Sequence, residues 1–157
     1  MAAMDSDELA RVIEEESALL FENFDEAVAF SLGSSMQARA LAQGARIVID
    51  IRLWDRPLFY AALPGSTGSN PEWARRKINV VRLFHKSSYR MALEQRREDR
   101  TFPPRYGLDV SDYVLAGGGF PIRVRSAGVI GAIAVSGLAE HEDHDMIVAA
   151  IGKFVGG

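Results

Sequence analysis

The feature that most constrains this fold is a change of hydrophobic period at Gly44. Before it, apolar residues recur at the spacing of amphipathic helices over residues 6–21 and 25–43. Gly44 is a suitable left-handed cap for the end of the second helix. After it, "ARIVIDIRLWDRPLFYAALPG" contains two β-rich runs around "WDRP". This pattern predicts an antiparallel hairpin packed against helices.

The second half of the chain repeats the alternation of helix and strand. Asn70-Pro71 predicts the start of a long helix that continues to about Asp99, before the prolines at 103 and 104. Three short β segments follow, "DYVLAGGG", "FPIRVRS" and "GVIGAIAVSGL", and then a helix over residues 142–154. The order α-α-β-β-α-β-β-β-α predicts one α+β domain over residues 1–157, with a mainly antiparallel sheet flanked by helices. Residues 1–24 form an acidic helical extension of it.

Composition excludes several classes of protein. The 157 residues include no cysteine, so neither disulfides nor thiolate metal sites are possible, and a reducing cytoplasm is the expected location. The acidic start "MAAMDSDELARVIEEES" lacks the basic and apolar parts of a signal peptide. No stretch approaches the roughly 20 apolar residues that span a bilayer, so no membrane association is expected.

The net charge of −3 hides an asymmetry between two segments. Residues 1–26 carry nine acidic groups against one arginine, and residues 71–106 carry ten lysines and arginines against four acidic groups. The basic segment lacks the aromatic and glycine interleaving of single-strand readers, so no nucleic-acid partner is expected. A solvated or inter-subunit charged face is the expectation, for example an acidic helix against the basic helix of a neighbouring subunit.

Lys77 is the first candidate for a functional residue, because it falls within the apolar arc of the predicted long helix. An amine in that position is costly unless it is paired. It can extend to solvent or bind a carboxylate or helix-end carbonyls at a subunit contact. Alternatively, it can reach an anionic ligand together with the helix N-terminus, Asn70, Trp73 and Arg76. Ser88, in the same arc, is interpreted as a small packing residue.

The run "LAGGGFPI" contributes Gly117, Gly118 and Gly119 as further candidates. Three glycines allow a tight turn or a ligand lying on the backbone, and the residues leave both alternatives open. No helix follows the run, so it is not a dinucleotide fingerprint. "SNPEWARRKI" likewise lacks the glycine spacing of a phosphate loop.

His144 shares a helix face with Ile147 and Ile151, so a buried, hydrogen-bonded histidine is the first interpretation. A metal or haem ligand and a general acid–base are the alternatives, with His85 as second candidate for such a role. "HEDH" does not meet the zinc pattern HExxH, so no metal is assigned. Glu142 and Asp143 are expected to cap and charge the start of the last helix. No catalytic set follows from spacing, and enzymatic activity stays open.

At "LAGGGFPIRV", "GVIGAIAVSGL" and "EDHDMIVAAI" the chain resembles the haem-degrading-domain superfamily, also called GlcG-like or HbpS-like. With "GSTGSNPEWARRK" and "SSYRM", it resembles the branch of short uncharacterised bacterial and fungal proteins. The resemblance covers residues 25–155. It implies a five-stranded sheet flanked by helices and assembly into symmetric homo-oligomers.

These observations favour a binding domain that forms a homo-oligomer larger than a dimer. Its ligand is expected to be a small anionic or tetrapyrrole molecule, held between the long helix and "GGGFP". An oligomeric interaction or scaffold protein is the alternative, and a closed ion pair at Lys77 would favour it. No cofactor is assigned. Because His85 and His144 are the candidate axial ligands in a chain without cysteine, weak or no specific haem binding is predicted.

Overall fold

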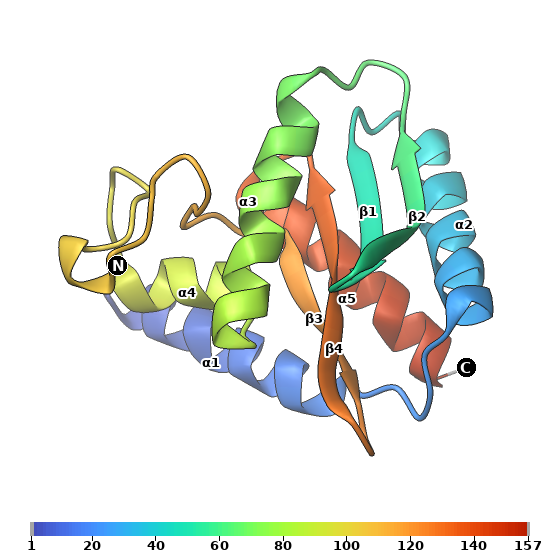
Figure 1. Ribbon diagram of the computed structural model, residues 1–157, viewed down its shortest axis with the longest axis horizontal. Coiled ribbons are helices and arrows are strands. Elements are labelled where there is room, and N and C mark those ends of the chain that lie inside the picture. The colour runs from blue at the N-terminus through green and yellow to red at the C-terminus, as the bar shows by residue number, and fades with distance from the viewer. Residues whose placement is uncertain (1, 157) are drawn as a thin grey trace.

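The chain forms an open antiparallel sheet with helices on both faces (Figure 1). The computed structural model describes residues 2–156. Its elements, in chain order, are α1 (Ala2–Ala18), α2 (Glu26–Gln43), β1 (Val48–Leu53), β2 (Arg56–Ala62), α3 (Ser69–Phe84), α4 (Ser88–Gln95), the 3-10 turn η1 (Pro104–Tyr106), β3 (Gly119–Val124), β4 (Gly128–Ser136) and α5 (Glu140–Gly156). The order of strands in the sheet is β2-β1-β4-β3. The predicted α+β class and the antiparallel sheet are therefore confirmed.

Strand β4 separates two apolar layers, because successive side chains of a strand point to opposite faces. Ile133 and Val135 face the larger core, which α2 and α5 cover. Ala132 and Ala134 face α3, where they pack against Ile78 and other apolar residues of that helix. The small alanine side chains let α3 lie close to the sheet. This close contact brings the start of α3 near the end of β4.

Helix α2 and the first hairpin follow the sequence prediction. The side chain of Asp25 accepts a hydrogen bond from the backbone N–H of Val28, and Gly44 ends the helix in the left-handed conformation with φ of 66°. Strands β1 and β2 pair in antiparallel register, with Val48 opposite Ala62. The capping and hairpin signals are therefore confirmed.

The sheet has four strands, so the expectation of five was wrong. Residues 112–118, the larger part of "DYVLAGGG", run as irregular chain. Leu115 is buried among Val80, Met91 and Phe102, so helix packing rather than strand pairing covers this apolar segment. The outer edge of β3 is instead contacted by Phe21, whose N–H donates to the carbonyl of Arg123. An apolar run alone does not distinguish these two modes of burial.

The predicted long helix is broken, which is a second correction. Helix α3 ends at His85, whose φ of 55° is left-handed, and α4 begins after a new cap at Ser87. The hydroxyl of Ser87 accepts a hydrogen bond from the N–H of Arg90. Ser88 therefore does not share a helical wheel with Lys77. It is buried, as expected, but its hydroxyl also accepts a hydrogen bond from the N–H of Gly119 at 2.9 Å.

Helix α1 ends at Ala18, earlier than predicted, and packs on α4 of the same chain. Tyr89 of α4 donates to Oε2 of Glu8 at 2.8 Å, and Arg90 pairs with Glu16 at 3.3 Å. The acidic helix therefore contacts a basic residue of α4 in the same chain; the basic helix of a neighbouring subunit was one example of the charged contact that the sequence suggested. Among the helices of residues 2–156, none is long and apolar enough to cross a bilayer.

Candidate functional site

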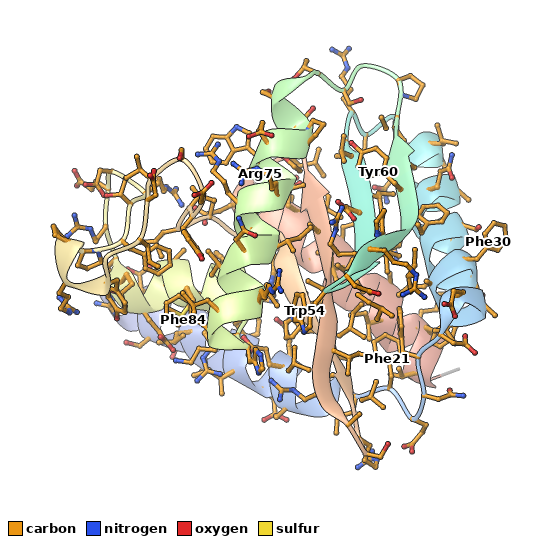
Figure 2. The ribbon with its side chains drawn as sticks, in the orientation of Figure 1. Phe21, Phe30, Trp54, Tyr60, Arg75 and Phe84 are labelled. Carbon is orange, nitrogen blue, oxygen red and sulfur yellow. The ribbon has the colours of Figure 1, made fainter. Side chains whose placement is uncertain are left out.

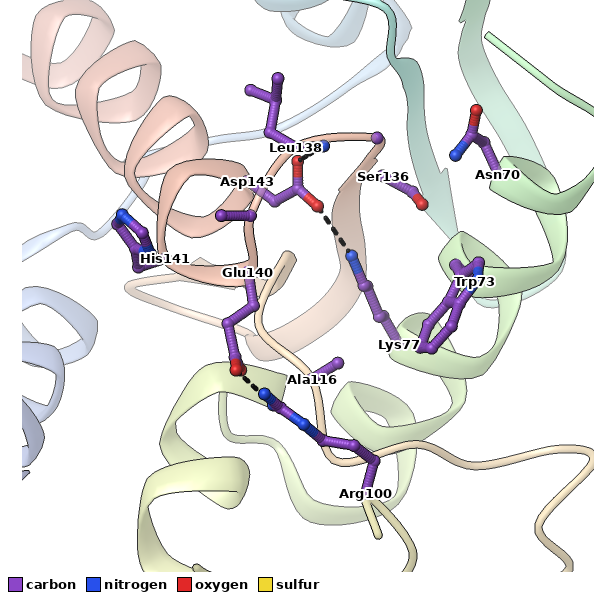
Figure 3. A pocket seen from close by; sticks show the side chains of 12 residues that line it. Asn70, Trp73, Lys77, Arg100, Ala116, Ser136, Leu138, Glu140, His141 and Asp143 are labelled. Carbon is purple, nitrogen blue, oxygen red and sulfur yellow. Dashed lines mark hydrogen bonds and ion pairs between the residues drawn. The ribbon is translucent and has the colours of Figure 1, made fainter. Parts of the chain in front are cut away.

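A pocket of about 560 Å³ lies where α3, α5 and the chain around Arg100 meet (Figure 3). Helices α3 and α5 both begin beside it, so N–H groups that have no partner within the helix lie near its walls. The lining residues are Asn70, Trp73, Lys77, Arg100, Ala116, Ser136, Gly137, Leu138, Ala139, Glu140, His141 and Asp143. The pocket therefore contains three of the residues predicted from sequence, which are Asn70, Trp73 and Lys77.

The amine of Lys77 forms a closed ion pair at the base of the pocket. Its Nζ lies 3.0 Å from Oδ2 of Asp143 and 3.0 Å from the carbonyl oxygen of Val135. The two side chains are only 4% and 2% exposed. The partner of Lys77 is therefore a carboxylate, as one of the sequence alternatives proposed. This carboxylate belongs to α5 of the same chain, whereas that alternative had placed it at a subunit contact.

Burial determines the protonation chemistry of this pair. Desolvation lowers the pKa of Lys77 and raises the pKa of Asp143, and in both cases the attraction between the two groups opposes it. The other carboxylate oxygen of Asp143 accepts the N–H of Leu138 at 3.0 Å. An ammonium group has three N–H donors, and two of those of Lys77 have protein acceptors. The third donor has no acceptor among the described residues, and Lys77 lines the pocket.

The glycine run allows the backbone to approach α3 and α5 closely. A Cβ at Gly118, where φ is +124°, would lie 2.6 Å from Nζ of Lys77. A Cβ at Gly119 would lie 2.9 Å from the carbonyl oxygen of Lys77, and one at Gly117 would lie 2.7 Å from that of Glu140. None of the three glycines lines the pocket. The space that they leave is occupied by the protein's own helices.

The rim of the pocket combines an aromatic ring with a second ion pair. Trp73 is exposed there, and the guanidinium of Arg76 lies 4.4 Å from the centre of its ring, just outside the pocket lining. Across the pocket, Arg100 forms an ion pair with Glu140 (Figure 3). Glu140 also accepts the N–H of Gly117 at 3.1 Å. The rim therefore offers both an apolar surface and charged groups.

His144 lies outside this pocket. Its ring is fully buried against Tyr89 and Phe120, with centroid distances of 5.0 and 5.7 Å. Its Nε2 lies 2.8 Å from Oε1 of Glu15, whereas its Nδ1 has no partner within the described chain. His144 is therefore buried, as predicted, and hydrogen-bonded through one of its two ring nitrogens.

The other two histidines are exposed. The ring of His85 stacks on that of Trp54, with 6.5 Å between the ring centroids. His85 does not line the pocket, so nothing here supports its proposed role as a ligand or general acid–base. His141 is the histidine that lines the pocket, although in Figure 3 its ring lies beyond Glu140, away from Lys77. The structure therefore does not bring His144, His85 and Lys77 together.

Three groups near His144 have the spacing of metal ligands. Atoms of Glu15, His144 and Asp145 lie within 4.8 Å of one another. The guanidinium of Arg11 already contacts both carboxylates, at 2.6 Å for Glu15 and 3.2 Å for Asp145. A cation of the protein itself thus balances these charges. The cluster provides no reason to assign a metal.

Sequence reasoning missed Asp143, Ser136 and the pair of Arg100 with Glu140. Asp143 was assigned to the start of the last helix, and it does accept the N–H of Leu138 there. However, Asp143 also lies four and eight residues before Ile147 and Ile151, on the buried face of α5. An acid on that face, together with a lysine on the buried face of α3, is the signal that could have identified the pair.

Comparison with known proteins gives consistent matches. The model of the family described as "Haem degrading protein HbpS-like" matches residues 24–152. UPF0303 protein mlr5144 of Mesorhizobium japonicum is 62% identical over 151 residues, which cover 96% of this chain and 90% of the relative.

Solved structures share the fold. That of the Ybr137w protein superposes with a TM-score of 0.86 at 26% identity, covering 94% of this chain and 87% of the other. A PduOC–haem complex superposes with a TM-score of 0.66 at 17% identity, covering 85% and 94%. At 17% identity, the similarity to the PduOC–haem complex shows a shared fold and no more.

Proposed function

This chain belongs to the HbpS-like family of haem-degrading proteins, and from that premise we propose that it is a ligand-binding domain whose ligand occupies the pocket between α3 and α5. The proposed ligand is a small anionic molecule. The observation that carries this proposal is the third N–H donor of Lys77, for which residues 2–156 provide no acceptor. The charge of Asp143 offsets that of Lys77, so recognition depends on directed hydrogen bonds more than on net charge.

Two further groups support an anionic ligand with an apolar part. Ser136 ends β4 on the pocket wall, and in Figure 3 its hydroxyl points to the space between Lys77 and Asn70. The ring of Trp73 provides a flat apolar surface beside these donors. A carboxylate at the donors and a hydrocarbon or aromatic group on Trp73 would satisfy both surfaces.

Thermal unfolding tests this proposal. Citrate, phosphate or benzoate should raise the midpoint of unfolding as concentration increases, because a ligand that binds only the folded state stabilises it. Ser136→Ala and Trp73→Leu should reduce that rise and leave the buried ion pair intact. Ser17→Ala is the matched control, because Ser17 is an exposed serine of α1 whose hydroxyl bonds only to Glu14. Equal stabilisation of wild type, Ser136→Ala and Trp73→Leu would contradict the proposal.

A tetrapyrrole is a possible member of the ligand class, since the fold is shared with a solved haem complex. The residues present fit haem iron poorly, however. His144 is committed to Glu15, His85 lies away from the pocket, and the ring of His141 is turned from its centre. We therefore keep the prediction of weak or no specific haem binding. A Soret band that saturates at one haem per chain and is lost in His141→Ala would overturn it.

An oligomeric scaffold is the second candidate function. The closed pair of Lys77 and Asp143 favours it, because the charge of the lysine is already balanced without a ligand. Large apolar side chains are also exposed on α2, among them Phe30, which is 67% exposed and points away from the body of the protein (Figure 2). We propose a homo-oligomer larger than a dimer. Light scattering that gives the 17.2 kDa monomer at micromolar concentration would contradict it.

A further inference from the structure

Two pockets of this chain share one wall, and the wall is an ion pair. A second pocket of about 490 Å³ lies beside the first, between α4, the start of α1 and the chain after α4. Arg100 and Glu140 line both pockets. Their guanidinium and carboxylate form an ion pair, which Figure 3 shows as it borders the first pocket. Among the described residues, these are the two whose side chains line both pockets.

This wall can open without unfolding its surroundings. The side chains of Arg100 and Glu140 are 47% and 25% exposed, unlike the buried pair at Lys77. Exposed ion pairs contribute little to stability, because water screens them and the side chains lose freedom on pairing. Arg100 also donates to the carbonyl oxygen of Leu115 at 3.2 Å. Its guanidinium can therefore exchange one carboxylate for another while that second bond holds it in place.

The second pocket offers a cation at its far side. Arg96 and Arg97 line it together with the apolar Leu93 and Leu115 and with the acidic Asp5 and Glu98. Arg97 already pairs with Asp99 at 3.2 Å. Arg96, which ends α4 in the left-handed conformation, makes no ion pair within the described part of the chain. An anionic group entering this pocket would therefore meet an unpaired guanidinium.

We propose that the ligand is an elongated dicarboxylate with an apolar body that occupies both pockets at once. One carboxylate binds at the donors of Lys77 and Ser136. The body lies along Trp73 and Leu115, and the second carboxylate replaces Glu140 on Arg100 and faces Arg96. This inference rests on the ligand site proposed above. It adds a length requirement and assigns Glu140 the role of a competing internal carboxylate.

Isothermal titration calorimetry with four acids tests the inference. Succinate and benzoate are short acids, hexadecanedioate is an elongated dicarboxylate, and palmitate has the same chain length without the second carboxylate. Hexadecanedioate should bind about tenfold more tightly than palmitate, the effect of one charge-assisted hydrogen-bonded pair. Arg100→Met should abolish that difference. Glu140→Gln should strengthen hexadecanedioate binding about threefold or more, because the competing charge is gone while an acceptor for Gly117 remains.

The control is Arg105→Met, which removes an exposed arginine of η1 that lines neither pocket. It should leave the binding of all four acids unchanged, and unfolding midpoints establish that each variant is folded. If hexadecanedioate binds no more tightly than palmitate and Glu140→Gln changes neither, the two-pocket inference is wrong. Binding of benzoate that is lost in Ser136→Ala would then leave the first proposal standing. If none of the four acids binds the folded wild type, both proposals fail.

Discussion

Asp143 and Glu16 are both buried carboxylates of this protein, and they are held in different ways. At the base of the pocket, Asp143 meets one full positive charge, Lys77, and both side chains are held by helices packed on the sheet. Under α1, buried Glu16 accepts the N–H and the hydroxyl of Ser87, and its other oxygen meets the partly exposed Arg90. Because one buried cation neutralises Asp143, the loss of that cation should remove the whole charge stabilisation of the first region. Several weaker donors make the second tolerant of partial loss.

The largest effect should come from Lys77→Met, which keeps the apolar stem and removes the charge. Asp143 would then be buried without its partner, which costs on the order of 3–5 kcal/mol of the free energy of unfolding. Urea unfolding followed by circular dichroism measures it. The double variant Lys77→Met/Asp143→Asn should regain much of that loss, because no lone charge remains and an acceptor for Leu138 is retained.

A Lys77→Met protein as stable as wild type would show that Asp143 is uncharged when buried. Desolvation raises the pKa of Asp143, and the removal of Lys77 removes the attraction that opposes this rise. For an acid whose folded pKa is raised, the folded state binds the proton more tightly than the unfolded state. Lowering the pH through the folded pKa should therefore reduce the cost of Lys77→Met.

A smaller loss is expected for Glu16→Ala under α1. The N–H and hydroxyl of Ser87 would lose their acceptor, which costs about 1–3 kcal/mol. Glu14→Ala is the matched control, since Glu14 is an exposed glutamate of the same helix, and it should change stability by no more than about 0.5 kcal/mol. Urea unfolding of the two variants compares them. Equal effects would mean that α1 is not held by Glu16.

Acid should loosen α1 gradually. The hydrogen bond from Arg11, opposed by desolvation, lowers the pKa of Glu8 from 4.5 to about 2, with further help from Tyr89. The folded pKa is depressed, so the stabilisation is complete above pH 4.5 and is lost as the pH falls towards 2. Amide hydrogen exchange within α1 should accelerate across that window. In Glu8→Gln this part of the pH dependence should be absent.

The smallest effect is expected for Arg100→Met in the free protein. Its ion pair with Glu140 is largely exposed, so the free energy of unfolding should change by about 1 kcal/mol or less. Urea unfolding measures it beside Lys77→Met. A loss as large as that of Lys77→Met would mean that this wall is structural and not displaceable.

The sequence predicts most of the fold where signals are local. The glycine at the end of α2 and the first hairpin each depend on neighbouring residues, and these predictions were correct. The break at His85 was missed because a left-handed histidine has no strong local signal, although Ser87 could have indicated a new cap. The fifth strand was wrong because the apolar run around Leu115 is buried by helices.

The site was predicted only in part, because local sequence signals reveal single residues but not their contacts with distant segments. Lys77 could be identified because an amine within an apolar arc conflicts with its own helix. Its partner Asp143 lies 66 residues later, and no local pattern joins the two. Arg100 enters the pocket from irregular chain, where sequence periodicity carries no information. Contacts between distant segments thus define the part of the pocket that the sequence did not reveal.

The pairing of β1 with β4 has a consequence for the order in which the chain folds during its synthesis. Val48 lies opposite Ser136, so the middle of the sheet joins residues from distant parts of the chain. The two outer hairpins, β1–β2 and β3–β4, are local and can form as soon as each is synthesised. Joining them closes a long loop that contains α3 and α4, a slow step for entropic reasons. Asp143, the partner of Lys77, lies on α5, which is the last element to leave the ribosome. During synthesis the amine of Lys77 therefore stays solvated until α5 is available, and the pocket forms last.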